Sequence, residues 1–101
     1  MDANINNFVS WLQDHEDEFP PFSNELIDAA AKAVEQGGYS KAREAVFSSK
    51  ADAKEKLGLE VILDQLESSG VDKEKGSFLV RRIDSISKLS GYDEGGLGWH
   101  T

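Results

Sequence analysis

Apolar side chains recur at the spacing of an α-helix along most of this chain. Near the N-terminus, one stripe with i, i+3, i+4, i+7 spacing is formed by Ile5, Phe8, Val9 and Leu12. The same spacing returns after residue 23, at Ile27, Ala30, Ala31 and Val34. The pattern predicts a helix over residues 4–14 and the beginning of a second helix near residue 24.

Residues 24–47 are predicted to form a helical hairpin. Ser23 is suited to cap its first helix, because a serine hydroxyl accepts a hydrogen bond from an amide of the first turn. Gly37 and Gly38 are suited to end that helix, since glycine adopts left-handed backbone angles at little cost. Ser40 can then cap a second helix, whose apolar residues are Ala42, Ala45, Val46 and Phe47.

The sequence of residues 37–42, GGYSKA, followed by Val46, resembles the turn of a tetratricopeptide-type helical hairpin. The first helix carries Ala where that family has an aromatic residue, and no second copy appears at a fixed period. Such units need about three stacked copies to be stable. We therefore expect an ordinary antiparallel helix pair here.

A third apolar region predicts a helix that ends near residue 69. Ser49 and Asp52 have the S-x-x-D form of a capping box. Gly58 lies within this helix and indicates a kink or a close helix crossing. The predicted apolar face consists of Leu57, Val61, Ile62, Leu63 and Leu66.

The last predicted helix begins after Asp72, which is suited to cap it, and ends at Gly91. Upstream, Pro20 and Pro21 interrupt the helical pattern between two phenylalanines. We expect the segment of residues 19–22 to form a rigid elbow whose phenylalanines pin it to the core. The fold predicted from these elements is all-α, a compact bundle of about five helices with a glycine-rich C-terminal tail. Residues 1–91 would form a single helical domain, and residues 92–101 a tail that is flexible or folded back.

The net charge of −8 is distributed unevenly along the chain. Residues 1–31 hold seven acids and no Lys or Arg, whereas residues 32–91 hold ten acids and eleven bases. A field of this sign repels phosphates and attracts basic surfaces. Direct nucleic-acid binding is therefore not expected. We expect instead a protein partner with a basic surface.

Catalytic and cofactor chemistry is not indicated by the sequence. The chain has no Cys and only two His residues, His15 and His100, and it lacks the common phosphate-binding glycine motifs. We expect a protein that is not an enzyme and that has no cofactor and no metal site. No apolar run reaches the roughly 18 residues that a membrane helix needs. We therefore expect no membrane association and a cytoplasmic location, and the oligomeric state is left open.

The leading functional hypothesis is a small acidic protein-binding module, such as an inhibitor, an immunity-type protein or an adaptor. One alternative is a nucleic-acid mimic that blocks a DNA- or RNA-binding protein. Another is a structural subunit of a homo-oligomer or a larger assembly. The candidate partner-binding residues are Trp11, Asp14, Glu16, Asp17, Glu18, Glu25 and Asp28. For Trp11, packing in or beside the core is the competing interpretation.

Overall fold

The computed structural model describes residues 3–83, and this part of the chain is helical without any strand. Its elements are α1 (Ala3–Asp14), a 3-10 turn η1 (Glu16–Glu18), α2 (Asn24–Ser48), α3 (Ala53–Ser68) and α4 (Lys73–Arg81). The all-α prediction is confirmed for these residues. Four α-helices are present among them, and α2 spans both helices of the predicted hairpin. The remainder of the last predicted helix and the glycine-rich tail lie outside the described residues.

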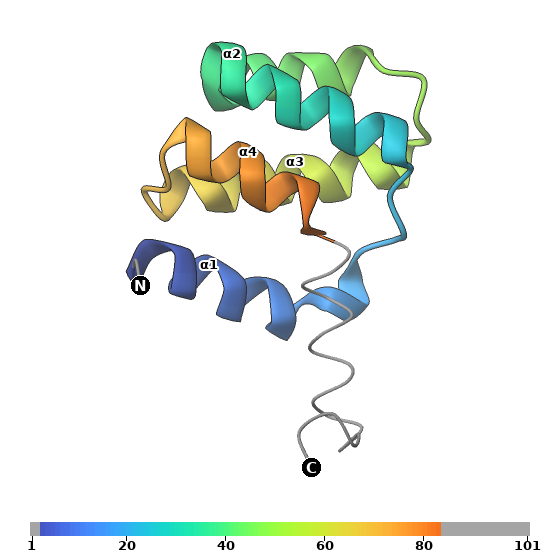
Figure 1. Ribbon diagram of the computed structural model, residues 1–101. Helices are drawn as coiled ribbons and strands as arrows, with labels where there is room; N and C mark the ends of the chain where they lie inside the picture. The colour runs from blue at the N-terminus through green and yellow to red at the C-terminus, as the bar shows by residue number, and fades with distance from the viewer. Residues whose placement is uncertain (1–2, 84–101) are drawn as a thin grey trace.

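The α2 element is a hairpin of two antiparallel arms, residues 24–37 and residues 39–48 (Figure 1). Gly38 separates them with φ 85° and ψ −173°, a backbone conformation that residues with a Cβ rarely adopt. At the start of the first arm, the Ser23 hydroxyl accepts from the Leu26 amide at 3.3 Å. The predicted cap and the predicted glycine turn are therefore confirmed.

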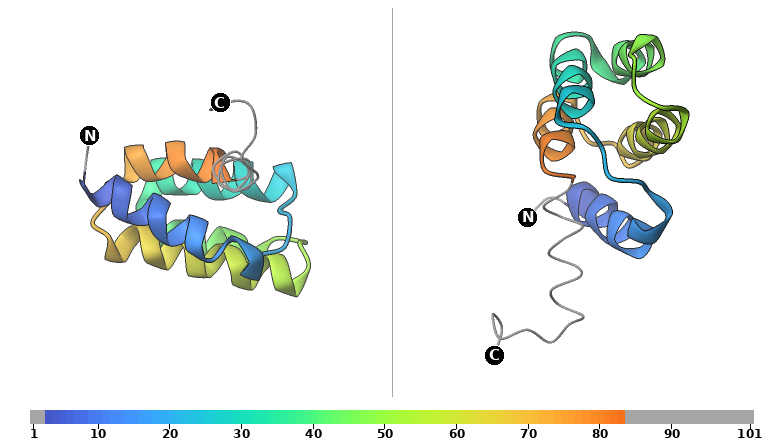
Figure 2. Two further views of the ribbon diagram at one scale, coloured as in Figure 1. Left: turned by 90° about the horizontal axis from the view of Figure 1, so that it is seen from below. Right: turned by 90° about the vertical axis from the view of Figure 1, so that its right-hand side faces the viewer.

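The helices form layers that the right-hand view of Figure 2 shows end-on. The first arm of α2 lies beside α4, the second arm lies beside α3, and α1 lies on the opposite side of the α3–α4 pair. Ala30, Ala31 and Ala42 are completely buried, which lets the arms of α2 approach their neighbours closely. The largest fully buried side chains are Phe8, Leu12, Val34, Val46, Leu59, Ile62, Leu63, Leu66 and Val80.

The apolar face predicted for α3 is partly wrong. Leu57 and Val61 are exposed, at 63% and 47% of their full surface. The buried stripe instead begins at Leu59 and continues through Ile62, Leu63 and Leu66. These four positions already have i, i+3, i+4, i+7 spacing, so at 3.6 residues per turn Leu57 and Val61 fall on the opposite side of the helix.

The capping box predicted at the start of α3 is also wrong. Asp52 itself is the N-cap, and its carboxylate accepts from the Lys54 amide at 3.0 Å. The Ser49 hydroxyl belongs to the preceding helix end, where it donates to the Val46 carbonyl at 2.7 Å. An S-x-x-D pair therefore spans two helix ends here.

The turn from α3 to α4 consists of a glycine that ends α3 and an aspartate that caps α4. Gly70 has φ 78°, and its amide donates to the Glu67 carbonyl at 3.0 Å. The Val71 amide donates to the Leu66 carbonyl at 3.2 Å, which completes a Schellman motif. Asp72 then caps α4 by accepting from the Lys75 amide at 2.9 Å, as predicted.

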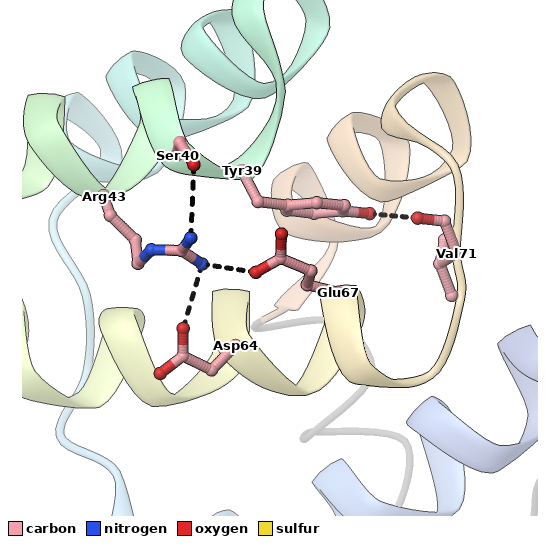
Figure 3. A network of polar contacts seen from close by, with 6 residues as sticks. All are labelled: Tyr39, Ser40, Arg43, Asp64, Glu67 and Val71. Carbon is pink, nitrogen blue, oxygen red and sulfur yellow. Dashed lines mark hydrogen bonds and ion pairs between the residues drawn. The ribbon is translucent and has the colours of Figure 1, made fainter.

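Two buried hydrogen bonds tie α2 to the α4 region. The Tyr39 hydroxyl donates to the Val71 carbonyl at 2.7 Å (Figure 3). The Ser77 hydroxyl donates to the Ala31 carbonyl at 2.9 Å. Burial raises the pKa of Tyr39 to about 12, and the nearby Asp72 and Glu67 carboxylates add to the shift. The hairpin is thus held at its turn and along its first arm.

Candidate protein-binding surface

The C-terminal end of α1 is fixed by an aromatic stack. Trp11 and His15 lie one turn apart, with ring centroids 5.0 Å from each other. His15 Nδ1 donates to the Trp11 carbonyl at 2.8 Å, which fixes the imidazole at the helix end. Trp11 is half-buried and packs against the core, so its structural role is present whether or not it also contacts a partner.

The elbow of residues 19–22 extends this aromatic cluster onto α3 with rings that are tilted rather than stacked. Phe19 lies 5.7 Å from Trp11 and 6.5 Å from Phe22, measured between ring centroids. Both phenylalanines approach Gly58, where an added Cβ would lie 3.2 Å from the Phe22 ring and 3.3 Å from the Phe19 ring. The pinned elbow is therefore confirmed. The close contact at Gly58 is made by these two rings of the elbow rather than by the helix crossing that the sequence suggested.

Four of the predicted site residues gather between α1 and the elbow, and we call them the acidic corner: Asp14, Glu16, Asp17 and Glu18. The side chains of Asp14, Asp17 and Glu18 are exposed. Glu16 is half-buried, and its Oε2 atom is buried without a hydrogen-bond partner among residues 3–83. No ion pair within the described residues involves any of the four. Their negative charge is therefore not held in an ion pair by any base of residues 3–83.

The two other predicted acids lie on α2, away from the corner. Asp28 is paired with Arg81 of α4 at 2.6 Å and with Lys32 at 3.5 Å. The hydrogen bond from Arg81 and the charge of Lys32 hold the pKa of this carboxyl below its usual value. Glu25 is exposed in the first turn of α2 and lines a shallow pocket with Lys50. The structure therefore brings together four of the six predicted acids, and Asp28 has an internal role.

A second cluster of ion pairs joins the other arm of α2 to α3, and its basic residue is Arg43. The Arg43 guanidinium lies 2.8 Å from Glu67 and 3.0 Å from Asp64, both on α3 (Figure 3). The hydrogen bond to Glu67 is the main cause that raises the pKa of Arg43. Arg43 and Arg81 thus form ion pairs between helices at the surface, while the acidic corner has no such pairing among the described residues.

A groove beside the acidic corner was not predicted from the sequence. It has a volume of about 560 Å³ and is lined by Asp17, Glu18, Phe19, Pro20, Lys54, Leu57, Gly58 and Val61. The exposed Leu57 and Val61 form its apolar wall. The sequence did contain a signal for this surface, because the buried stripe of α3 is complete without these two residues.

No group of three or more His, Asp or Glu side chains within residues 3–83 is arranged to hold a metal ion. Among the same residues, no helix has the length and apolar character needed to cross a bilayer. Comparison of the chain with protein-family models, with curated proteins and with solved structures gives no match.

Proposed function

We propose that this protein is a small protein-binding module, of the inhibitor, immunity-type or adaptor kind, whose acidic corner meets a basic surface on its partner. We propose a cytoplasmic location for it, in keeping with the absence of cysteine. The observation that carries the proposal is the grouping of Asp14, Glu16, Asp17 and Glu18 in one place with no ion pair among the described residues.

The contrast between paired and unpaired charges supports this assignment. Two acids that join helices, Asp28 and Asp64, each lie within ion-pair distance of an arginine on another helix. In the acidic corner, like charges accumulate at the C-terminal end of α1, where the helix dipole disfavours them. A local electrostatic cost without an internal partner is expected where the charge acts on another molecule. Complementary charge of this kind mainly raises the association rate and excludes wrong partners.

A nucleic-acid mimic is the second candidate, and the pairing of Asp28 bears on it. A mimic needs carboxylates spaced like phosphates along one face. Asp28 would be the last acid of a row over residues 14–28. It forms ion pairs with Arg81 and Lys32, which offset its charge. We therefore favour a partner that contacts the compact acidic corner over one that reads a long row of charges.

Affinity capture from source-cell lysate, at low and at high salt, tests the proposal. The wild-type bait is compared with a corner variant that carries Asp14→Lys, Asp17→Lys and Glu18→Lys, all at exposed positions. We expect one predominant partner that is lost in high salt and is not captured by the corner variant, because screening and charge reversal both remove the attraction. Glu16 is left unchanged, since its half-buried side chain makes a lysine there a risk to folding.

A matched control separates the position of the charge from its total. Glu35→Lys, Glu44→Lys and Glu74→Lys change three other exposed acids and shift the net charge by the same amount. Each substitution adds two charges, so both triple variants go from −8 to −2. The control variant should retain the partner. Loss of the partner in both variants, or in neither, would argue against a localised acidic binding surface.

A further inference from the structure

The groove beside the acidic corner has an apolar wall and an acidic rim. Leu57 and Val61 lie one turn apart on α3 and form the wall. Phe19 and Pro20 of the elbow form the opposite side. Asp17 and Glu18 extend from the acidic corner along the rim. The α3 residues that line the groove run from Lys54 to Val61, so it follows this helix for about two turns.

The exposure of Leu57 and Val61 is unlike that of the other aliphatic residues of α3. Leu59, Ile62, Leu63 and Leu66 are completely buried, so the core contact of this helix does not use the outer pair. Two large aliphatic side chains at i and i+4 on an otherwise polar outer face form the kind of ridge on which another helix packs. Phe19 and Pro20 of the elbow lie beside this ridge without covering it, and the groove is the space between them.

The charges around the groove indicate the chemistry of the occupant. Asp17 and Glu18 form no ion pair among residues 3–83, and no Lys or Arg precedes Lys32 in the sequence. Lys54 is the one basic side chain in the lining. The lining therefore has a net charge of −1, and the adjacent Asp14 and Glu16 make the surroundings more negative.

We infer that this groove binds an amphipathic helix of the partner, with aliphatic side chains at i and i+4 against Leu57 and Val61 and with Lys or Arg toward Asp17 and Glu18. Recognition of this type places the apolar face of a helix in a groove and reads it through side chains at i, i+3 and i+4. The inference rests on the proposed function and adds to it the class of segment that the acidic corner recognises. The aliphatic contacts hold the bound helix in the groove, and the acidic rim sets its orientation.

Titration of the isotopically labelled full chain with a helical peptide of Leu and Lys tests this inference directly. The control peptide has Glu at every Lys position. With the Leu–Lys peptide, we expect amide chemical-shift changes at Asp17 and Glu18 and along residues 54–61. The Leu–Glu peptide should leave these amides unchanged, because its charge opposes that of the rim.

Variants of the apolar wall and of the rim separate the two contributions. Leu57→Ser with Val61→Ser should weaken binding of the Leu–Lys peptide at least about tenfold, since both contacts are lost. Phe47→Ser with Phe78→Ser removes two other exposed apolar side chains and should leave the affinity unchanged. All four positions are exposed, so the folded state should survive, and circular dichroism verifies this.

Lys54→Glu provides a test in the opposite direction. It changes the lining from −1 to −3 without touching the apolar wall. Binding of the basic peptide should therefore become tighter, by roughly tenfold at low salt. A glutamate also suits the first turn of α3, so the fold is not expected to suffer.

Other occupants give different results in the same experiments. Arg82 lies 4.4 Å from the exposed Phe78 ring, so a second copy of this chain could offer an apolar and basic surface of its own. Concentration-dependent sedimentation that is abolished by Leu57→Ser with Val61→Ser would assign the groove to self-association and overturn the inference. Equal binding of both peptides, or shift changes remote from residues 17–18 and 54–61, would overturn it as well.

The outcomes also distinguish this inference from the proposed function. If the captured partner depends on Asp14, Asp17 and Glu18 but is unaffected by the wall variant, the acidic corner is the binding surface and the groove is not. If the Leu–Lys peptide binds the groove while capture is unaffected by the corner variant, the groove inference stands and the proposed function fails.

Discussion

Gly76 illustrates how one residue can be required by the contact of two helices. Local helix propensity alone makes this residue of α4 unfavourable, because glycine lowers helix propensity. In the structure, an added Cβ at this position would lie 2.9 Å from Cζ of Tyr39 and closer still to its hydroxyl oxygen. Tyr39 cannot move away without losing its hydrogen bond to the Val71 carbonyl. Glycine is therefore needed for space at residue 76.

Gly76→Ala should lower the free energy of unfolding by about 1–3 kcal/mol, the usual range for overpacking a buried contact. Helix propensity alone would give a gain of about 1 kcal/mol. Urea denaturation measures the difference. Combining the change with Tyr39→Phe should recover part of the loss, since the hydroxyl is the closest atom. A stabilised Gly76→Ala variant would contradict this packing.

Tyr39 also predicts a dependence of stability on alkaline pH. Burial raises its pKa from 10.0 to about 12, so the folded state holds the phenolic proton where the unfolded chain releases it. Stability from this group is complete below pH 10 and is lost as the pH rises from 10 toward 12. The decline should be steeper in the wild type than in Tyr39→Phe, measured by thermal unfolding across this range. Identical pH profiles for the two proteins would show that Tyr39 does not titrate in this way.

Helix ends and helix faces differed in how well the sequence predicted them. Ser23, Gly38 and Asp72 were correctly placed, because helix ends depend on local chemistry that neighbouring residues show directly. The buried face of α3 was predicted less well. Five apolar residues between 57 and 66 were grouped together, Leu59 was omitted, and the exposed pair Leu57 and Val61 was assigned to the core. Local hydrophobicity does not reveal which side of a helix a distant segment will cover.

At the turn of α2, the two arms depend on Gly38. Its φ of 85° with ψ −173° lies in a region that is accessible almost only to glycine. Gly38→Ala should therefore destabilise the protein by about 1–3 kcal/mol, although no atom lies near the added Cβ. Chemical denaturation gives the value, and Gln36→Ala at a nearby exposed position is the control. A loss no larger than that of the control would indicate that the turn adapts without strain.

The distribution of charge over the whole molecule separates structural acids from candidate binding acids. The sequence showed the excess of acids in the first third of the chain, but it could not show which of them are paired. Asp28 was predicted as a binding residue and is joined to Arg81, 53 positions away. Such a pairing arises only when α2 and α4 pack together. The groove next to the acidic corner escaped prediction for the same reason, since it requires the elbow and α3 to meet at Gly58.

The most direct test of the central claim is the association rate constant between this protein and its captured partner, measured by stopped flow at low salt. The corner variant with Asp14→Lys, Asp17→Lys and Glu18→Lys is compared with the control variant that changes Glu35, Glu44 and Glu74. Since steering depends on where the charges lie, the corner variant should associate at least about tenfold more slowly than the wild type. The control variant should remain within about twofold of the wild type. Equal slowing of both variants would show that only net charge matters and would contradict a binding surface at the acidic corner.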